Sequence, residues 1–178
     1  MQGYVERNLE EVNREELLEV VHEILEAECG LHVRTQLRRS IQKYISEFEP
    51  SGRHFVALYR DETPRAALAV DRVNSERAVL KWRFVAESDR RKGLGSSLVD
   101  RTIGFAEGAG YDRLVLGTMT QMESAHRLYE KKEFVYKEQV KFWRRPLMIY
   151  ERSLRQNGGR TRRAPGGAEI HPNEQGSQ

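Results

Sequence analysis

A polar, basic loop with two glycines constrains the fold of this chain more than any other stretch. It joins an apolar run with strand character, residues 79–85, to a periodic apolar segment, residues 94–109, that predicts a helix. The N-terminus of a helix attracts anions through its free N–H groups and its dipole, and glycine lets a ligand approach the backbone closely. Arg90, Arg91 and Lys92 add positive charge at the same place. The layout predicts a phosphate or pyrophosphate site; the alternative is a solvated loop that opens an ordinary helix.

The spacing within the loop narrows the class of phosphate ligand. It is not a Walker loop, because Lys92 precedes its glycine and no Gly-Lys-Ser/Thr follows. Gly93 and Gly95 lack the third glycine of the dinucleotide fingerprint. The residues Arg90-Arg91-Lys92-Gly93-Leu94-Gly95 fit the pattern Arg/Gln-x-x-Gly-x-Gly/Ala. This pattern resembles the acyl-CoA pyrophosphate loop of the GNAT superfamily of N-acetyltransferases.

Composition bounds the class of protein. The 178 residues are enough for one domain with a real core, and 38% are hydrophobic and 32% charged. No apolar run approaches the roughly 20 residues that span a bilayer, and the N-terminus lacks the apolar region of a signal peptide. The single cysteine, Cys29, excludes an internal disulfide and fits a reducing, cytoplasmic location. A net charge of +3 argues against a nucleic-acid binder, so neither nucleic acid nor membrane is an expected partner.

Hydrophobic periodicity and turn residues predict eleven elements in the order β-α-α-β-β-β-α-β-α-β-β. They are a strand at Tyr4–Leu9, helices at 14–28 and 33–48, strands at His54–Arg60, Pro64–Val73 and Ala78–Val85, a helix at 94–109, a strand at Arg113–Met119, a helix at 122–132, and strands at Phe134–Glu138 and Leu147–Leu154. Residues 155–178 carry too little apolar surface to offset the entropy of ordering them, which predicts a disordered tail.

A second motif strengthens the resemblance. The segment Ala125-His126-Arg127-Leu128-Tyr129-Glu130-Lys131-Lys132-Glu133-Phe134 resembles the GNAT helix end A-x-x-L-Y-E-K-x-G-F. The order of elements is also similar, so the resemblance covers about residues 4–154. It implies a mixed α/β, GNAT-like acyl-CoA N-acyltransferase fold in a single domain, residues 1–154. Three positions depart from the pattern: Glu133 replaces a glycine, Met122 an asparagine and Glu87 a proline.

The resemblance also implies a function. It is the transfer of an acetyl group from acetyl-CoA directly to a primary amine of a small molecule, peptide or protein, without a metal. The backbone edge at Phe84 and Val85 would bind the pantetheine arm, and Tyr129 would protonate the leaving thiolate. The pyrophosphate would lie on Arg90, Arg91, Lys92, Gly93, Leu94, Gly95 and Ser96.

Several alternatives stay open at this level. The general base is Glu76, Glu87, His54 or a water chain. Trp82 is either core or a wall of the acceptor pocket. Neither the acceptor amine nor assembly as a homodimer is decided. A regulatory module that binds CoA with little or no catalysis is the alternative function.

Overall fold

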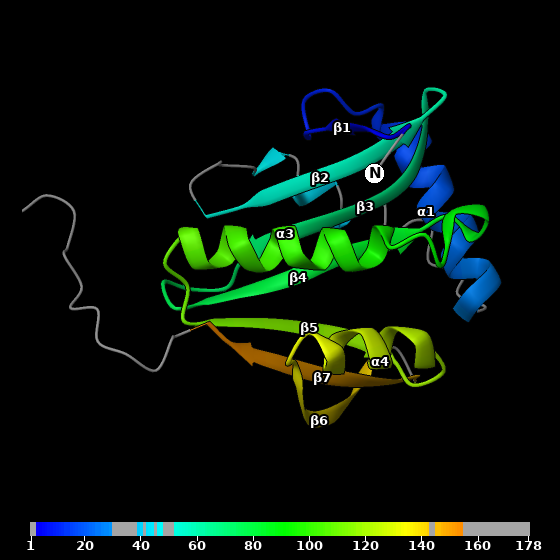
Figure 1. Cartoon of the computed structure of the whole chain (residues 1–178). Helices are drawn as coiled ribbons and strands as arrows, with labels where there is room; N and C mark the ends of the chain where they lie inside the picture. The colour runs from blue at the N-terminus through cyan, green and yellow to red at the C-terminus, as the bar shows by residue number, and fades with distance from the viewer. Residues whose placement is uncertain are drawn as a thin grey trace, which may run out of the picture.

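The computed structural model describes residues 3–29, 39–40, 42–44, 46–47, 52–142 and 145–154. These residues form a seven-stranded sheet with the strand order β1-β2-β3-β4-β5-β7-β6. Helices α3 and α4 cover one face of the sheet, in front of the strands in Figure 1, and α1 packs on the opposite face. The elements are β1 (Val5–Arg7), α1 (Arg14–Cys29), β2 (His54–Arg60), β3 (Thr63–Arg72), β4 (Arg77–Val85), the short helix η1 (Glu87–Asp89), α3 (Leu94–Gly108), β5 (Arg113–Met119), α4 (Glu123–Lys131), β6 (Val135–Phe142) and β7 (Arg145–Ser153).

The expected mixed sheet is confirmed, and so is the expected order of the elements other than the helix at 33–48. The strands at His54–Arg60 and Arg113–Met119 have the predicted bounds, whereas β1 is shorter and β6 runs on to Phe142. The polar residues of β6 carry little strand signal, and the backbone pairing of β6 with β7 extends the strand. Much of the helix expected at 33–48 lies outside the described residues, and those described at 39–40, 42–44 and 46 are helical. The tail from residue 155 on also lies outside them.

Strands β4 and β5 form the one parallel pair between neighbours in this sheet, and α3 connects them. Their pairing covers only Arg77–Leu80 against Arg113–Leu116. Beyond Leu80, β4 continues for five residues to Val85 without a partner in β5. The two strands therefore separate toward their carboxyl ends, and the edge of β4 from Lys81 to Val85 has no strand partner on the β5 side; we call this gap in the backbone pairing the slot.

A β-bulge interrupts β4 at the start of this slot. Ala67 of β3 pairs with Phe84 and Ala69 pairs with Lys81, so that two residues, Trp82 and Arg83, lie opposite one. Trp82 has the left-handed φ of 50°. The extra residue reverses the face to which each later side chain of β4 points, because side chains alternate between the two faces of a strand.

The side chains of β4 show this change of face. Lys81 pairs with Asp71 at 2.8 Å on the α1 face, and Trp82 lies on that face too, edge-on to Tyr44 at 4.7 Å. Arg83 then points to the face that α3 and α4 cover, and Phe84 returns to the α1 core. The bulge therefore brings a charged side chain to the α4 side of the slot.

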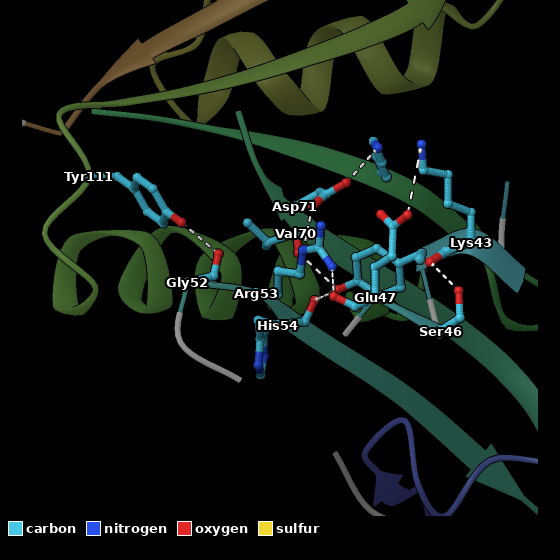
Figure 2. A network of polar contacts seen from close by, with 11 residues as sticks. Lys43, Ser46, Glu47, Gly52, Arg53, His54, Val70, Asp71 and Tyr111 are labelled. Carbon is cyan, nitrogen blue, oxygen red and sulfur yellow. Dashed lines mark hydrogen bonds and ion pairs between the residues drawn. The ribbon is translucent and has the colours of Figure 1, made fainter. Parts of the chain in front are cut away.

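A polar network joins the segment that holds Lys43 and Glu47 to strands β2 and β3 (Figure 2). The buried hydroxyl of Tyr44 lies 2.9 Å from the carbonyl oxygens of both His54 and Val70, which share its one proton as acceptors. Asp71 pairs with Nε of Arg53 at 2.7 Å and with Lys81. These contacts lie on the α1 face of the sheet, at the start of β2 and the end of β3.

No helix in the described part of the chain is long and apolar enough to cross a membrane.

Candidate functional site

The loop that follows β4 ends in the N-terminus of α3. Gly93 caps the helix with a φ of 81°, a conformation that glycine adopts at little cost. The first helical hydrogen bond runs from the amide of Ser97 to the carbonyl of Gly93 at 3.0 Å. The amides of Leu94, Gly95 and Ser96 precede it and point out of the helix end, and the first turn carries no acidic residue. The helix therefore presents a positive end toward the slot.

Asp89, which the sequence analysis did not single out, anchors this loop. Its carboxylate is fully buried although it is charged. Burial opposes ionisation, yet hydrogen bonds from Lys92, Tyr4 and Ser88 and the charge of Arg60 lower its pKa to about 2. Its partners are Tyr4 (2.6 Å), Lys92 (2.8 Å), Ser88 (3.1 Å), Arg60 (3.1 Å) and Arg65 (3.7 Å). The carboxylate thus ties the loop to the segment before β1 and to the hairpin of β2 and β3.

The three basic residues of the loop have different surroundings. Lys92 lies against Asp89, so its charge is already shared with a carboxylate. Arg90 donates from Nε to the carbonyl of Val85 at 3.4 Å, and Arg91 is exposed with a left-handed φ of 61°. The backbone amides of the helix end are therefore the donors that the loop presents most directly to an anion.

Tyr129 lies in the last turn of α4 with 3% of its surface exposed. Its ring packs edge-on against Phe134 at 5.7 Å and beside Tyr150 at 6.2 Å, centroid to centroid. The guanidinium carbon of Arg83 lies 4.9 Å from the centre of the ring. Burial raises the pKa of the Tyr129 phenol, and the charge of Arg83 and a hydrogen bond from it oppose that rise. The phenol is therefore protonated at neutral pH and can donate.

The backbone places the three candidates for the general base differently. Glu76 precedes β4 at the end away from the slot, where its carbonyl accepts from the amides of Asp112 and Arg113. His54 starts β2 and stacks on Phe105 of α3 at 4.8 Å, and burial lowers its pKa.

His54 also lines a cleft of about 360 Å³ beside β1, at the level of Leu80 across the sheet. It therefore lies before the point where the slot opens. Of the three candidates, Glu87 lies at the carboxyl end of β4, separated from the strand by one residue.

Two of the departures from the family pattern, Glu133 and Met122, have structural consequences. Glu133 adopts a φ of 62°, so the turn keeps the left-handed geometry with a side chain in place of a glycine. Its carboxylate pairs with Arg152 at 2.7 Å, and Arg152 also donates to the carbonyl of Lys132. Met122 stands just before α4 and accepts a hydrogen bond at sulfur from Thr118 at 3.7 Å, with no side-chain cap on the helix.

A family model described as the acetyltransferase (GNAT) family matches residues 18–134, well over half of the 178-residue chain. The chain belongs to the GNAT acetyltransferase family. Acetyl-CoA is the acyl donor of this family, and the protein is accordingly an acetyl-CoA-dependent acyltransferase. A search of curated protein sequences finds no match to this chain.

Solved structures share the fold of this GNAT protein. An acetyltransferase from Streptococcus agalactiae is 21% identical with a TM-score of 0.76, over 86% of this chain and 99% of that chain. Ard1 from Thermoplasma volcanium is 17% identical with a TM-score of 0.70, over 86% and 99%. An acetyltransferase from Salmonella typhimurium, solved with its cofactor acetyl-CoA, is 15% identical with a TM-score of 0.64, over 89% and 98%.

The residues present fit a CoA thioester. The end of α3 offers unpaired amides for a pyrophosphate, and the space beyond Gly93 where a Cβ would point is open. The edge of β4 that lacks a partner in β5 includes Arg83, whose guanidinium carbon lies 4.9 Å from the centre of the Tyr129 ring. No group of three or more His, Cys, Asp or Glu side chains within the described residues could hold a metal ion.

Proposed function

We propose that this GNAT protein is an N-acetyltransferase that acts on a primary amine of a small molecule, peptide or protein. The observation that carries the proposal is the buried phenol of Tyr129, protonated at neutral pH, which lies beside Arg83 on the stretch of β4 that precedes the free amides at the start of α3. A positioned donor near such a helix end suits a reaction in which a leaving group gains a proton.

The roles follow from the geometry of the loop and of β4. The backbone amides at the start of α3 bind the pyrophosphate, because they are oriented outward before the ligand arrives. The edge of β4 after the bulge, at Phe84 and Val85, pairs with the amide groups of the pantetheine arm as an added strand would. The cofactor-binding set is Phe84, Val85, Arg90, Arg91, Lys92, Gly93, Leu94, Gly95 and Ser96.

Tyr129 supplies the proton. Acetyl-CoA brings an activated acyl group, so the protein needs no nucleophile of its own for direct transfer. The amine must lose a proton before or during attack, and Glu87 or a water chain at the carboxyl end of β4 removes it. Lys92 takes part through Asp89, since its ammonium holds the loop and shares its charge with that carboxylate.

Release of free CoA thiol from acetyl-CoA in the presence of a panel of amines tests the proposal. Tyr129→Phe removes the donor and keeps the ring, so acetyl-CoA should still bind while turnover falls by roughly ten- to a thousand-fold. Tyr136→Phe, on an exposed tyrosine of β6, is the matched control and should leave turnover unchanged.

Wild-type turnover in Tyr129→Phe, under conditions where chemistry limits the rate, would remove Tyr129 as the acid. Stabilisation of the protein by acetyl-CoA without turnover for any amine would instead support the regulatory module.

A further inference from the structure

Arg83 places a positive charge between the two helices that flank the slot. Its guanidinium carbon lies 4.9 Å from the centre of the Tyr129 ring on α4. One of its terminal nitrogens lies 3.5 Å from the position that a Cβ atom on Gly95 of α3 would take. The bulge at Trp82 produces this placement, because without it Arg83 would share the α1 face with Lys81.

This cation has no counter-ion in the described part of the chain. Nε of Arg83 is buried without a hydrogen-bond partner, and no described carboxylate forms an ion pair with the guanidinium. Other partly buried arginines do have one: Arg53 lies 2.7 Å from Asp71, and Arg60 lies 3.1 Å from Asp89. An uncompensated charge in such a place is costly, and active sites are where such costs are retained because charge develops there during the reaction.

The other groups around Tyr129 do not supply this charge. Phe134 is apolar, and Tyr150 of β7 is neutral, with its own hydroxyl directed to Glu130. Among the described residues, Arg83 is the ionisable side chain whose charge and hydrogen bond lower the pKa of the phenol and so favour a negative charge on its oxygen.

We propose that Arg83 is a positioning residue that acts through Tyr129: its guanidinium orients the phenol and stabilises the oxygen that gives up a proton to the departing sulfur. This proposal rests on the proposed function. As the amine nitrogen bonds to the acetyl carbon and the carbon–sulfur bond breaks, Tyr129 gives its proton to the sulfur. The phenol oxygen takes a proton back from water, and the surplus proton of the amine leaves to solvent through the base. Arg83 lies beside the negative charge throughout.

The complex with free CoA tests the proposal without an acceptor. In that complex the phenol and the bound thiol share their dissociable protons, so the first ionisation belongs to the pair. The ultraviolet absorbance of the thiolate, measured as the pH is raised, reports this first ionisation. Arg83→Met should raise the apparent pKa of the pair by about one to three pH units, the effect of an opposite charge at this range. Arg83→Lys keeps the charge, so its apparent pKa should lie between those of Arg83→Met and the wild type.

Two controls separate this effect from a general loss of charge or of structure. Arg127→Met, on the exposed side of the same helix α4, should leave the apparent pKa unchanged. In a Tyr129→Phe background, Arg83→Met should shift the apparent pKa of the bound thiol clearly less than it does when Tyr129 is present. If Arg83→Met does not fold, as judged by circular dichroism, Arg83→Gln is the neutral substitute.

An unchanged apparent pKa in Arg83→Met with CoA bound would overturn the proposal. So would weaker CoA binding with no change in thiol ionisation, which would assign Arg83 to a phosphate of CoA. An equal shift with and without the Tyr129 hydroxyl would mean that Arg83 acts on the sulfur directly, against the assignment through Tyr129. If Arg83→Met shifts the apparent pKa of the thiol but no amine is acetylated, the proposed N-acetyltransferase function is contradicted while the electrostatic role of Arg83 is supported.

Discussion

Replacing Asp89 by asparagine should destabilise the protein far more than a single loop substitution usually does. Asp89→Asn keeps the shape of the side chain and removes its charge. The carboxylate is fully buried and meets three cations, those of Arg60, Arg65 and Lys92, whose side chains keep 27–47% of their surface exposed. Water can therefore partly solvate the cations that the substitution leaves behind.

The size of the effect follows from the pKa of Asp89. A fall from 3.8 to about 2 corresponds to about 2 kcal/mol of stability at neutral pH. Breaking a buried pair by removing one partner costs about 3–5 kcal/mol, and the exposure of the cations places Asp89→Asn toward the lower end. We expect a loss of about 2–3 kcal/mol in the free energy of unfolding, or roughly 4–12 °C in melting temperature for a domain of this size.

The effect of this substitution should also depend on pH. The native carboxylate has the lower pKa, so its stabilising contribution is present above 3.8 and is lost as the pH falls toward about 2. The difference between wild type and Asp89→Asn should therefore shrink across that interval. Urea unfolding at neutral pH and at acid pH measures it.

Asp100→Asn is the matched control for the same chemical change. Asp100 pairs with Lys132 at 2.6 Å, but its side chain is 55% exposed, and surface pairs contribute about 0–1 kcal/mol. If Asp89→Asn were no more destabilising than Asp100→Asn at neutral pH, the charge of Asp89 would not anchor the loop. A difference that does not shrink in acid would show that the loss comes from packing instead.

Three further outcomes are expected. Gly95→Leu should abolish the rise in melting temperature that acetyl-CoA causes, because the new side chain would meet Arg83, Val85 and Leu128. Gly93→Ala should lower the free energy of unfolding by about 1–2 kcal/mol, because alanine is strained at a φ of 81°. An unchanged acetyl-CoA effect in both variants would remove the pyrophosphate assignment. Glu133→Gly should melt at a higher temperature than Glu133→Ala, since glycine relieves the φ of 62° and both lose the ion pair with Arg152; the reverse order would mean that the turn is unstrained. Truncation after Leu154 should leave the melting temperature and acetyl-CoA binding nearly unchanged, and a large loss would show that residues 155–178 pack on the domain.

The sequence by itself determined much of the local structure. Apolar periodicity located the helices α1 and α3 and the strands β2 and β5, because a helix or strand that buries one face repeats its apolar residues with the period of that structure. The glycine loop predicted an anion site at a helix N-terminus. Its Gly93 has a φ of 81°, a conformation that glycine adopts readily and that the residue type alone therefore made possible. The helix-end motif also drew attention to Tyr129, whose role stays a prediction.

The tertiary structure alone decided how these parts meet. Regular alternation along β4 would put Leu80, Trp82 and Phe84 on one face, but the bulge splits them and sends Arg83 to Tyr129. No local pattern marks a bulge, because its position depends on the register with β3.

Asp89 illustrates the same limit. Two acids, Glu87 and Asp89, before three consecutive cations suggest an ordinary charged loop. Only folding brings Tyr4, 85 residues away, and Arg60, 29 residues away, onto the carboxylate of Asp89. The sequence therefore determined which backbone conformations each segment favours. Which charges are buried, and which lie beside the reacting groups, is decided by contacts between distant segments, because desolvation and Coulomb energies depend on position in space and not on position along the chain.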